Sequence, residues 1–114
     1  MEKLYGANNF EELVRVEHIK HNEFIHALMA QGVRFTMPES VYIDYNVTIG
    51  RGTVIEGAAQ LTNGTTIGEF CTVKPFVVLD HATLEDNVTV GAQSVLEHAT
   101  VSKGTIVAPF SFIK

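Results

Sequence analysis

In the stretch Ile43-Asp-Tyr-Asn-Val-Thr-Ile49-Gly-Arg-Gly-Thr-Val-Ile55, an aliphatic residue returns at every sixth position. The series continues along the chain, with two steps of five, through Leu61, Ile67, Val73, Leu79, Leu84, Val90, Leu96, Val101, Val107 and Ile113. A second series of small or β-branched residues lies between these positions: Val47, Thr53, Ala59, Thr65, Cys71, Val77, Ala82, Val88, Ser94, Ala99, Thr105 and Ser111. A period of six matches neither an amphipathic helix nor a strand that alternates every second residue. It is the pattern of a hexapeptide β-helix, in which each hexapeptide supplies one short strand and one corner.

Three hexapeptides make one triangular coil, so every third aliphatic residue should stack in one column. The columns that follow are Ile43/Leu61/Leu79/Leu96/Ile113, Ile49/Ile67/Leu84/Val101 and Ile55/Val73/Val90/Val107. Residues 41–114 therefore predict a mainly β fold, a parallel β-helix of about four coils whose strands stack about 4.8 Å apart. A β-sandwich of short strands is the alternative. Thirteen consecutive aliphatic positions with a paired small-residue register favour the β-helix.

The two steps of five fall in segments of similar sequence. Leu79-Asp-His-Ala-Thr-Leu84 and Leu96-Glu-His-Ala-Thr-Val101 lie 17 residues apart, and each is one residue shorter than a full hexapeptide. We therefore expect two successive coils to share the same shortened corner, with His81 and His98 stacked about one strand spacing apart.

Residues 8–31 predict a helix that precedes the repeats. Asn8 and Asn9 provide candidate N-caps, and Glu11 and Glu12 are expected in the first turn. Gly32 is a natural residue to end the helix. An apolar stripe runs along one face, formed by Phe10, Leu13, Val14, Phe24, Ile25 and Leu28, with Val16 and Ile19 off the stripe. We expect residues 1–31 to form a helical arm whose stripe packs on the β-helix of residues 32–114 or on another subunit.

Composition narrows the function classes. The 114 residues carry a net charge of −5 without a basic patch, which argues against a nucleic-acid partner. No run of 18 apolar residues and no signal peptide are present, so no membrane partner is expected. Cys71 is the single cysteine and has no internal disulfide partner, which favours a reducing compartment. We expect a cytoplasmic protein.

Hexapeptide repeats are typical of left-handed parallel β-helices, many of which are trimeric acyltransferases with active sites between subunits. A closer resemblance rests on Gly6-Ala-Asn-Asn9, the helix, Gly32-Val33, Pro38-Glu39 and Tyr42-Ile43-Asp44. This order of motifs resembles the bacterial bifunctional UDP-N-acetylglucosamine pyrophosphorylase/glucosamine-1-phosphate N-acetyltransferases, where the pyrophosphorylase domain ends, a helical arm follows and the β-helix begins. The segment Ala108-Pro-Phe-Ser-Phe-Ile-Lys114 is similar to the family's G-P-[FY]-x-x-[IL]-R.

The resemblance implies roles for two residues. The Arg of the second motif contacts the sugar phosphate, and Lys114 keeps its charge without the bidentate fork. An Asn matching Asn8 holds a metal in the family, while Phe10 stands where an Arg is expected. The resemblance places the pyrophosphorylase nucleotide loop before Gly6, and the acetyltransferase histidine and acetyl-CoA coils after Lys114. We therefore expect neither active site to be complete in this chain.

Other candidate sites follow from the residues themselves. His81 and His98, each preceded by an acid, could share a metal or serve as a general base, or could be an exposed polar column of a repeating coil. A gamma-class carbonic anhydrase would need a third histidine from a neighbouring subunit, and its ligand spacing is not seen. His18, His21 and His26, with Glu17 and Glu23, have metal-ligand spacings, although such residues are more commonly surface groups of a solvated helix. Cys71 belongs to the small-residue series and is expected to be a packed core thiol rather than a nucleophile.

Three functions are consistent with these observations. The first is a non-catalytic trimeric scaffold related to the pyrophosphorylase/acetyltransferase family, with no cofactor. The second is an acyltransferase or sugar-phosphate-binding enzyme that uses His81 or His98 at a subunit interface. The third is an arm subunit of a separately encoded nucleotidyltransferase. Acetyl-CoA or Mg²⁺ is expected only with the two enzyme alternatives.

Overall fold

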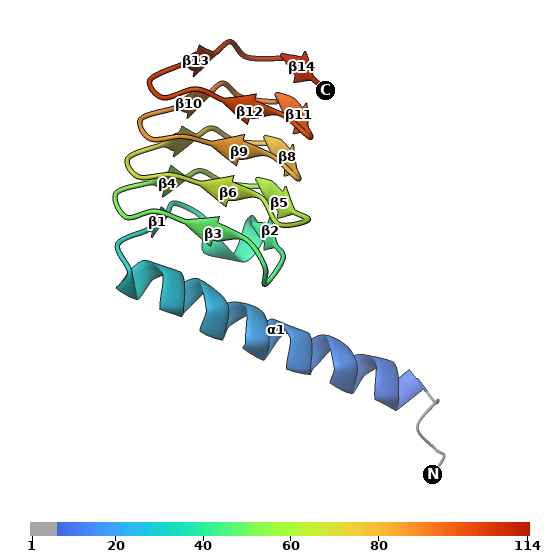
Figure 1. Cartoon of the computed structure of the whole chain (residues 1–114). Helices are drawn as coiled ribbons and strands as arrows, with labels where there is room; N and C mark the ends of the chain where they lie inside the picture. Colours follow the sequence, from blue (N-terminus) through green and yellow to red (C-terminus); the bar gives the residue numbers. More distant parts are fainter. Residues whose placement is uncertain (1–6) are drawn as a thin grey trace.

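One long helix and a column of short strands make up the structure, a computed structural model that describes residues 7–114 (Figure 1). Helix α1 (Ala7–Ala30) comes first, and the 3₁₀ turn η2 (Pro38–Ser40) lies within the first coil. Sheet A contains β1 (Arg34–Phe35), β4 (Val54–Ile55), β7 (Thr72–Val73), β10 (Thr89–Val90) and β13 (Ile106–Val107). Sheet B contains β2 (Tyr42–Ile43), β5 (Gln60–Thr62), β8 (Val78–Asp80), β11 (Val95–Glu97) and β14 (Phe112–Ile113). Sheet C contains β3 (Thr48–Ile49), β6 (Thr66–Ile67), β9 (Thr83–Leu84) and β12 (Thr100–Val101).

The chain visits the three sheets in turn and forms a left-handed parallel β-helix (Figure 1). Each strand pairs in parallel with the strand one coil later, in the register that the aliphatic columns predict: Ile43 pairs with Leu61, Ile49 with Ile67, and so on to Leu96 with Ile113. The twelve aliphatic residues from Ile43 to Val107 are all buried. The predicted period of six is therefore confirmed.

The solenoid is longer than the count of about four coils predicted from residue 41 onward, and has about five turns. The missed strand is β1, where Arg34 and Phe35 pair with Val54 and Ile55. Phe35 is buried beneath Ile55 at the start of the third column. This strand is hidden in the sequence because the residue at its inward position is aromatic, and because η2 interrupts the spacing to the next strand.

Small residues of the second series close the corners from inside. Thr53, Thr65 and Ser94 are completely buried, and their hydroxyl groups bond to the backbone of neighbouring corners. Thr53 Oγ1, for example, donates to Gly68 O at 2.8 Å and accepts from the Cys71 amide at 3.0 Å. These bonds satisfy polar atoms that would otherwise be buried without partners, so a hydroxyl is tolerated at a core position.

Steric crowding between the coils explains why glycine follows the aliphatic residue at several positions. A Cβ atom added at Gly50, Gly68 or Gly91 would collide with the backbone of the coil above it. The coils approach one another at strand spacing, which leaves no room for a side chain directed along the solenoid axis.

Helix α1 ends as the sequence predicts and begins differently. The Val33 amide donates to Leu28 O at 3.1 Å and the Gly32 amide to Met29 O at 2.9 Å, with Gly32 at a φ of +99°. This is a Schellman motif, which needs a residue that tolerates positive φ. At the other end, the helix already includes Ala7, so Asn8 lies inside the first turn and the predicted cap is wrong. The predicted acidic first turn is also wrong, because the first turn lies before Glu11.

The apolar stripe of α1 is only partly used within one chain. Ile25 and Leu28 are buried against the first coil, and Phe24 packs on Tyr45 with ring centroids 5.3 Å apart. Phe10 and Leu13 are 65% and 53% exposed, because this half of the helix extends beyond the solenoid (Figure 1). In the described part of the chain, no helix is both long enough and apolar enough to cross a membrane.

The stacked columns give a direct test of the packing. Leu79 is completely buried in the sheet B column, whereas Ile113 in the same column is 38% exposed. Leu79→Ala should lower the free energy of unfolding by about 2–5 kcal/mol, since it leaves a cavity between two coils. Ile113→Ala is the matched control and should lower it by only about 1 kcal/mol. Urea unfolding followed by circular dichroism measures both, and equal losses would contradict the column model.

Candidate functional site

A column of polar side chains follows the corner where the chain leaves sheet B for sheet C. In the second coil, the Asn63 amide donates to Asp44 Oδ2 at 2.9 Å, and the Gly64 amide donates to Asn46 Oδ1 at 3.1 Å. The next two coils have the shortened corner, and single residues in the left-handed region make the turn: His81 and His98, each with φ of +52°. The shortened corner expected from the sequence is thus the same corner in both coils.

His81 and His98 lie one above the other at this corner. Their ring centroids are 4.8 Å apart and the ring planes differ by 33°. Both side chains are exposed. The stacking follows from the backbone, because the His98 amide donates to Asp80 O at 2.9 Å and the His81 amide donates to Thr62 O at 3.1 Å. The two imidazoles are therefore held at strand spacing by the ladder of the solenoid.

Asp80 is bound to the coil before it. Its Oδ1 accepts hydrogen bonds from the Asn63 side-chain amide and from Thr62 Oγ1. These two bonds, helped by the nearby His98 and His81, hold the pKa of the Asp80 carboxyl below its usual range. In the described part of the chain, neither imidazole donates a hydrogen bond to a carboxylate, and the Asp80 carboxylate is bonded to the coil before it.

The hydrogen bond from Asn63 can be tested without changing the fold. Asn63 has a φ of +54°, a conformation that glycine adopts readily, so Asn63→Gly removes the side chain and keeps the corner. The Asp80 pKa should rise toward its ordinary value, measured by carbon-detected NMR titration. Because the Asp80 pKa is lower in the folded state than in the unfolded chain, the ionised carboxyl stabilises the fold at pH values above the ordinary Asp pKa of about 3.9. This stabilisation is lost as the pH falls through the folded-state pKa. An unchanged Asp80 titration in the variant would contradict this assignment.

Lys114 lies at the end of the same column. β14 pairs with β11 so that Ile113 lies over Leu96, and one further step in this register places Lys114 over Glu97. The structure thus brings the residue that the resemblance assigned to a sugar phosphate to the corner of His98. Asn8 lies in α1, and its side chain is outside the described part of the structure, as is Gly6 of the same motif.

The remaining predicted residues lie apart from this corner. His18 and His26 are exposed on α1, and the ring Nε2 of His21 lies 3.3 Å from Pro38 O. Among residues 7–114, no group of three or more His, Cys, Asp or Glu side chains is arranged to hold a metal ion. Cys71 is buried, its thiol lies 3.1 Å from Glu85 O, and burial raises its pKa. Its position is that of the core thiol predicted from the small-residue series.

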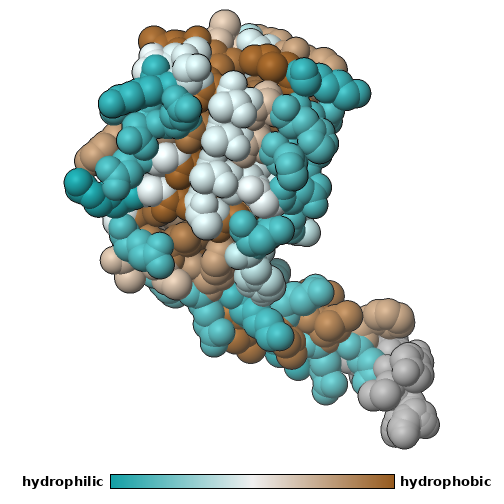
Figure 2. Space-filling view, in the orientation of Figure 1, coloured by the Kyte–Doolittle hydropathy of each residue, from teal (hydrophilic) through white to brown (hydrophobic). Residues whose placement is uncertain are grey.

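The outer faces of the three sheets differ in chemistry, a feature that the period of six does not reveal. On sheet C the outward residue of every strand is an exposed threonine: Thr48, Thr66, Thr83 and Thr100. Figure 2 shows these strands as a pale strip between two hydrophilic ones. On sheet B the outward residue that directly precedes each core aliphatic residue is mostly apolar: Tyr42, Gln60, Val78, Val95 and Phe112. The signal is present in the sequence, because each of these residues directly precedes a core aliphatic residue. The outward residue that follows the core residue in β5, β8 and β11 is polar: Thr62, Asp80 and Glu97.

A groove lies between α1 and the first coil. It has a volume of about 540 Å³. Its lining is formed by Glu17, His18, His21, Glu39, Ser40, Val41, Tyr42, Ile43, Asp44 and Tyr45. The spacing of the helical histidines suggests metal ligands but does not predict this groove, because the groove depends on how the helix crosses the first coil.

Comparison with known proteins agrees with this architecture. The chain is 33% identical over 113 residues to the bifunctional protein GlmU of Thermus thermophilus, and 36% identical over 113 residues to that of an Anaeromyxobacter species. It is 32% identical over 114 residues to the GlmU of Halalkalibacterium halodurans. These matches cover 99–100% of this chain and 23–25% of the relatives, so the chain spans about a quarter of their length. No protein-family model matches the chain.

The resemblance predicted from the order of motifs is confirmed by these matches. They include the arm, the opening of the β-helix and the closing Ala108–Lys114 segment, since almost every residue of the chain is aligned. The shared region is therefore a hexapeptide-repeat β-helix with its helical arm.

Proposed function

We propose that this GlmU-related hexapeptide-repeat chain is a non-catalytic scaffold that assembles as a homotrimer through the outer face of sheet B. The observation that carries the proposal is the apolar row on that face. Tyr42 and Phe112 are 59% and 66% exposed at its ends, and Val78 and Val95 lie between them. An exposed apolar strip of this kind on a globular domain commonly marks an interface with another protein.

The neighbouring corner extends this apolar face. Phe76 and Phe110 are 59% and 75% exposed on the corner between sheets A and B, with Gln93 at the equivalent position of the coil between them. Large aromatic side chains contribute most to protein interfaces when they are buried at the centre of the contact. Burial of this face against a second copy would contribute about 25 cal/mol of favourable free energy per Å² of apolar area removed from water.

Three copies fit this face by symmetry. In a three-fold ring the outer face of sheet B of each copy would lie against a different surface of the next copy, and the rotation closes the ring so that this face is covered in all three copies. The resemblance to trimeric hexapeptide-repeat proteins also supports an assembly of three copies. Sheet C does not suit this role equally well, because the hydroxyl groups of its threonine row can all remain hydrated.

The chemistry of the histidine corner supports the non-catalytic part of the proposal. The Asp80 carboxylate bonds to Asn63 and Thr62 of the coil below, so it stabilises the corner instead of orienting an imidazole. The scaffold proposal requires no cofactor. It also places the protein in the cytoplasm, where a single buried thiol at Cys71 is compatible with reducing conditions.

Assembly is tested with a matched pair of surface variants. Val78→Lys places a charge on the outer face of sheet B, and Thr83→Lys places the same charge at the equivalent position of the next strand, on sheet C. Light scattering at tens of micromolar should report a trimer for the unmodified chain and for Thr83→Lys, and a monomer for Val78→Lys. A stable monomer for the unmodified chain, or a trimer in both variants, would contradict the interface.

The absence of catalytic activity is tested separately on the unmodified chain. We expect neither pyrophosphorolysis of UDP-N-acetylglucosamine nor acetylation of glucosamine 1-phosphate by acetyl-CoA, measured against a protein-free blank. Turnover above the blank in either assay would overturn the non-catalytic proposal and leave the assembly proposal intact.

One observation favours a second candidate function. The histidine corner borders the apolar face of sheet B, so assembly would bring His81 and His98 near a neighbouring copy, with Lys114 at the end of the column. An acyltransferase or sugar-phosphate-binding enzyme with an interface histidine would use this arrangement. Loss of measured acetyl transfer in both His81→Ala and His98→Ala, with the trimer retained, would support this alternative over the scaffold.

A further inference from the structure

The groove between α1 and the first coil contains a strand edge that no other strand of the described chain pairs with. β2 is the last strand of sheet B and pairs with β5 alone. The amides of Tyr42 and Asp44 donate upward to Ala59 O and Leu61 O, both at 3.0 Å. Because alternate residues of a strand direct their backbone groups to opposite edges, the N–H and C=O of Ile43 are directed to the free edge. Such an edge is a template for another strand.

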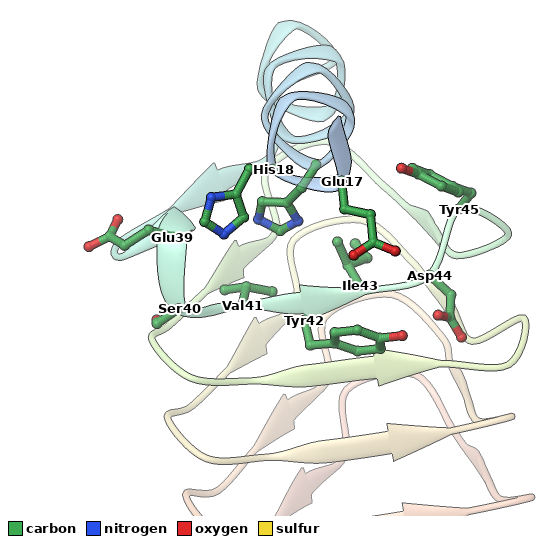
Figure 3. Close-up of a pocket in the computed structure, with 10 residues that line it drawn as sticks. Glu17, His18, Glu39, Ser40, Val41, Tyr42, Ile43, Asp44 and Tyr45 are labelled. Carbon is green, nitrogen blue, oxygen red and sulfur yellow. The ribbon is translucent and has the colours of Figure 1, made fainter. Parts of the chain in front are cut away.

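Helix α1 covers one side of the first coil and leaves the other side open. Ile25 and Leu28, in the last turns of α1, are only 3% and 4% exposed, so this part of the helix covers the end of the core. At Glu17 and His18 the helix has diverged from the coil, and the groove of about 540 Å³ opens beneath β2. Figure 3 shows Glu17 and His18 pointing from α1 toward the first coil, with Glu39 and Tyr45 at opposite ends of the groove.

The groove is acidic and aromatic. Its lining includes three carboxylates, two tyrosine rings and two histidines, and it includes neither Lys nor Arg: Glu17, Glu39 and Asp44; Tyr42 and Tyr45; His18 and His21. Asp44 already accepts the Asn63 amide, whereas Glu17 and Glu39 are exposed. Charge complementarity therefore selects a cationic occupant, and tyrosine rings provide surfaces for the stems and heads of Lys or Arg.

We propose that this groove is a docking site for an extended basic segment of a partner protein, which adds to sheet B as a strand below β2. Main-chain hydrogen bonds to Ile43 supply the affinity, and alternate Lys or Arg side chains reach the carboxylates of Glu17 and Glu39. This is the recognition mode of β-strand addition, in which the backbone gives affinity and alternate side chains give specificity. β2 spans only Tyr42–Ile43 and the chain turns at Tyr45, so this edge can pair with about three extended residues, or roughly 10 Å of chain. This inference goes beyond the scaffold proposal and does not depend on trimer assembly.

The test uses a fluorescein-labelled six-residue peptide of alternating Val and Lys, with blocked ends, and the full chain. Fluorescence polarisation should show saturable binding with one peptide per chain. The same peptide N-methylated at alternate residues cannot donate the ladder hydrogen bonds and should bind at least tenfold more weakly. A Val/Glu peptide should not bind. Equal affinity for the N-methylated peptide would overturn strand addition, because it would show attraction by charge alone.

Matched variants locate the site. The double variant Glu17→Gln/Glu39→Gln should weaken binding of the Val/Lys peptide at least tenfold. Glu11→Gln/Glu12→Gln removes the same number of charges from α1 outside the groove and should leave binding unchanged. Equal loss in both pairs would overturn the site, and so would the absence of saturable binding to the unmodified chain.

Amide NMR shifts provide an independent readout of the same complex. Addition of the Val/Lys peptide should shift the Ile43 amide and leave the amides of the threonine row on sheet C unchanged. Shifts centred on sheet C or on the histidine corner would overturn the site. A change of chain mass in Glu17→Gln/Glu39→Gln, measured without peptide, would identify a second copy of this chain as the occupant and overturn the proposed partner.

Discussion

Each coil of this protein is held in place by the coil above and below it, through a parallel hydrogen-bond ladder and through aliphatic side chains stacked in the same register. The ladder fixes the axial spacing, and the inward columns exclude water from between the coils. A residue therefore has a defined environment according to its place in the hexapeptide. Small residues fit the inner corners, glycine fits where the next coil leaves no room at Gly68, and outward positions are free to differ.

The same repetition turns single residues into columns of similar side chains. One shortened corner, used twice, brings His81 and His98 to 4.8 Å. The outward position of sheet C gives a row of threonines, and the outward position before each core residue of sheet B gives a row that is mostly apolar. A solenoid thus presents long, straight rows of similar side chains on its outer faces.

The sequence was informative where the period was strict. It predicted the register of all three sheets, the burial of the aliphatic series, the Gly32 end of the helix and the pairing of the two histidines. It failed at the first coil, where η2 and the aromatic Phe35 hide a strand from a search for aliphatic residues. It also misplaced the helix start, because the asparagine pair that looks like a cap lies inside the first turn.

The groove and the apolar face of sheet B could not be found from the period alone. The groove depends on the direction in which α1 leaves the first coil, which local propensity does not determine. The apolar face depends on comparing outward residues between sheets. Its most direct test is isotope-filtered NMR on a mixture of differently labelled copies. We expect intermolecular contacts at the methyl groups of Val78 and Val95; intermolecular contacts confined to Thr66 and Thr83 of sheet C, or none at all, would contradict assembly through sheet B.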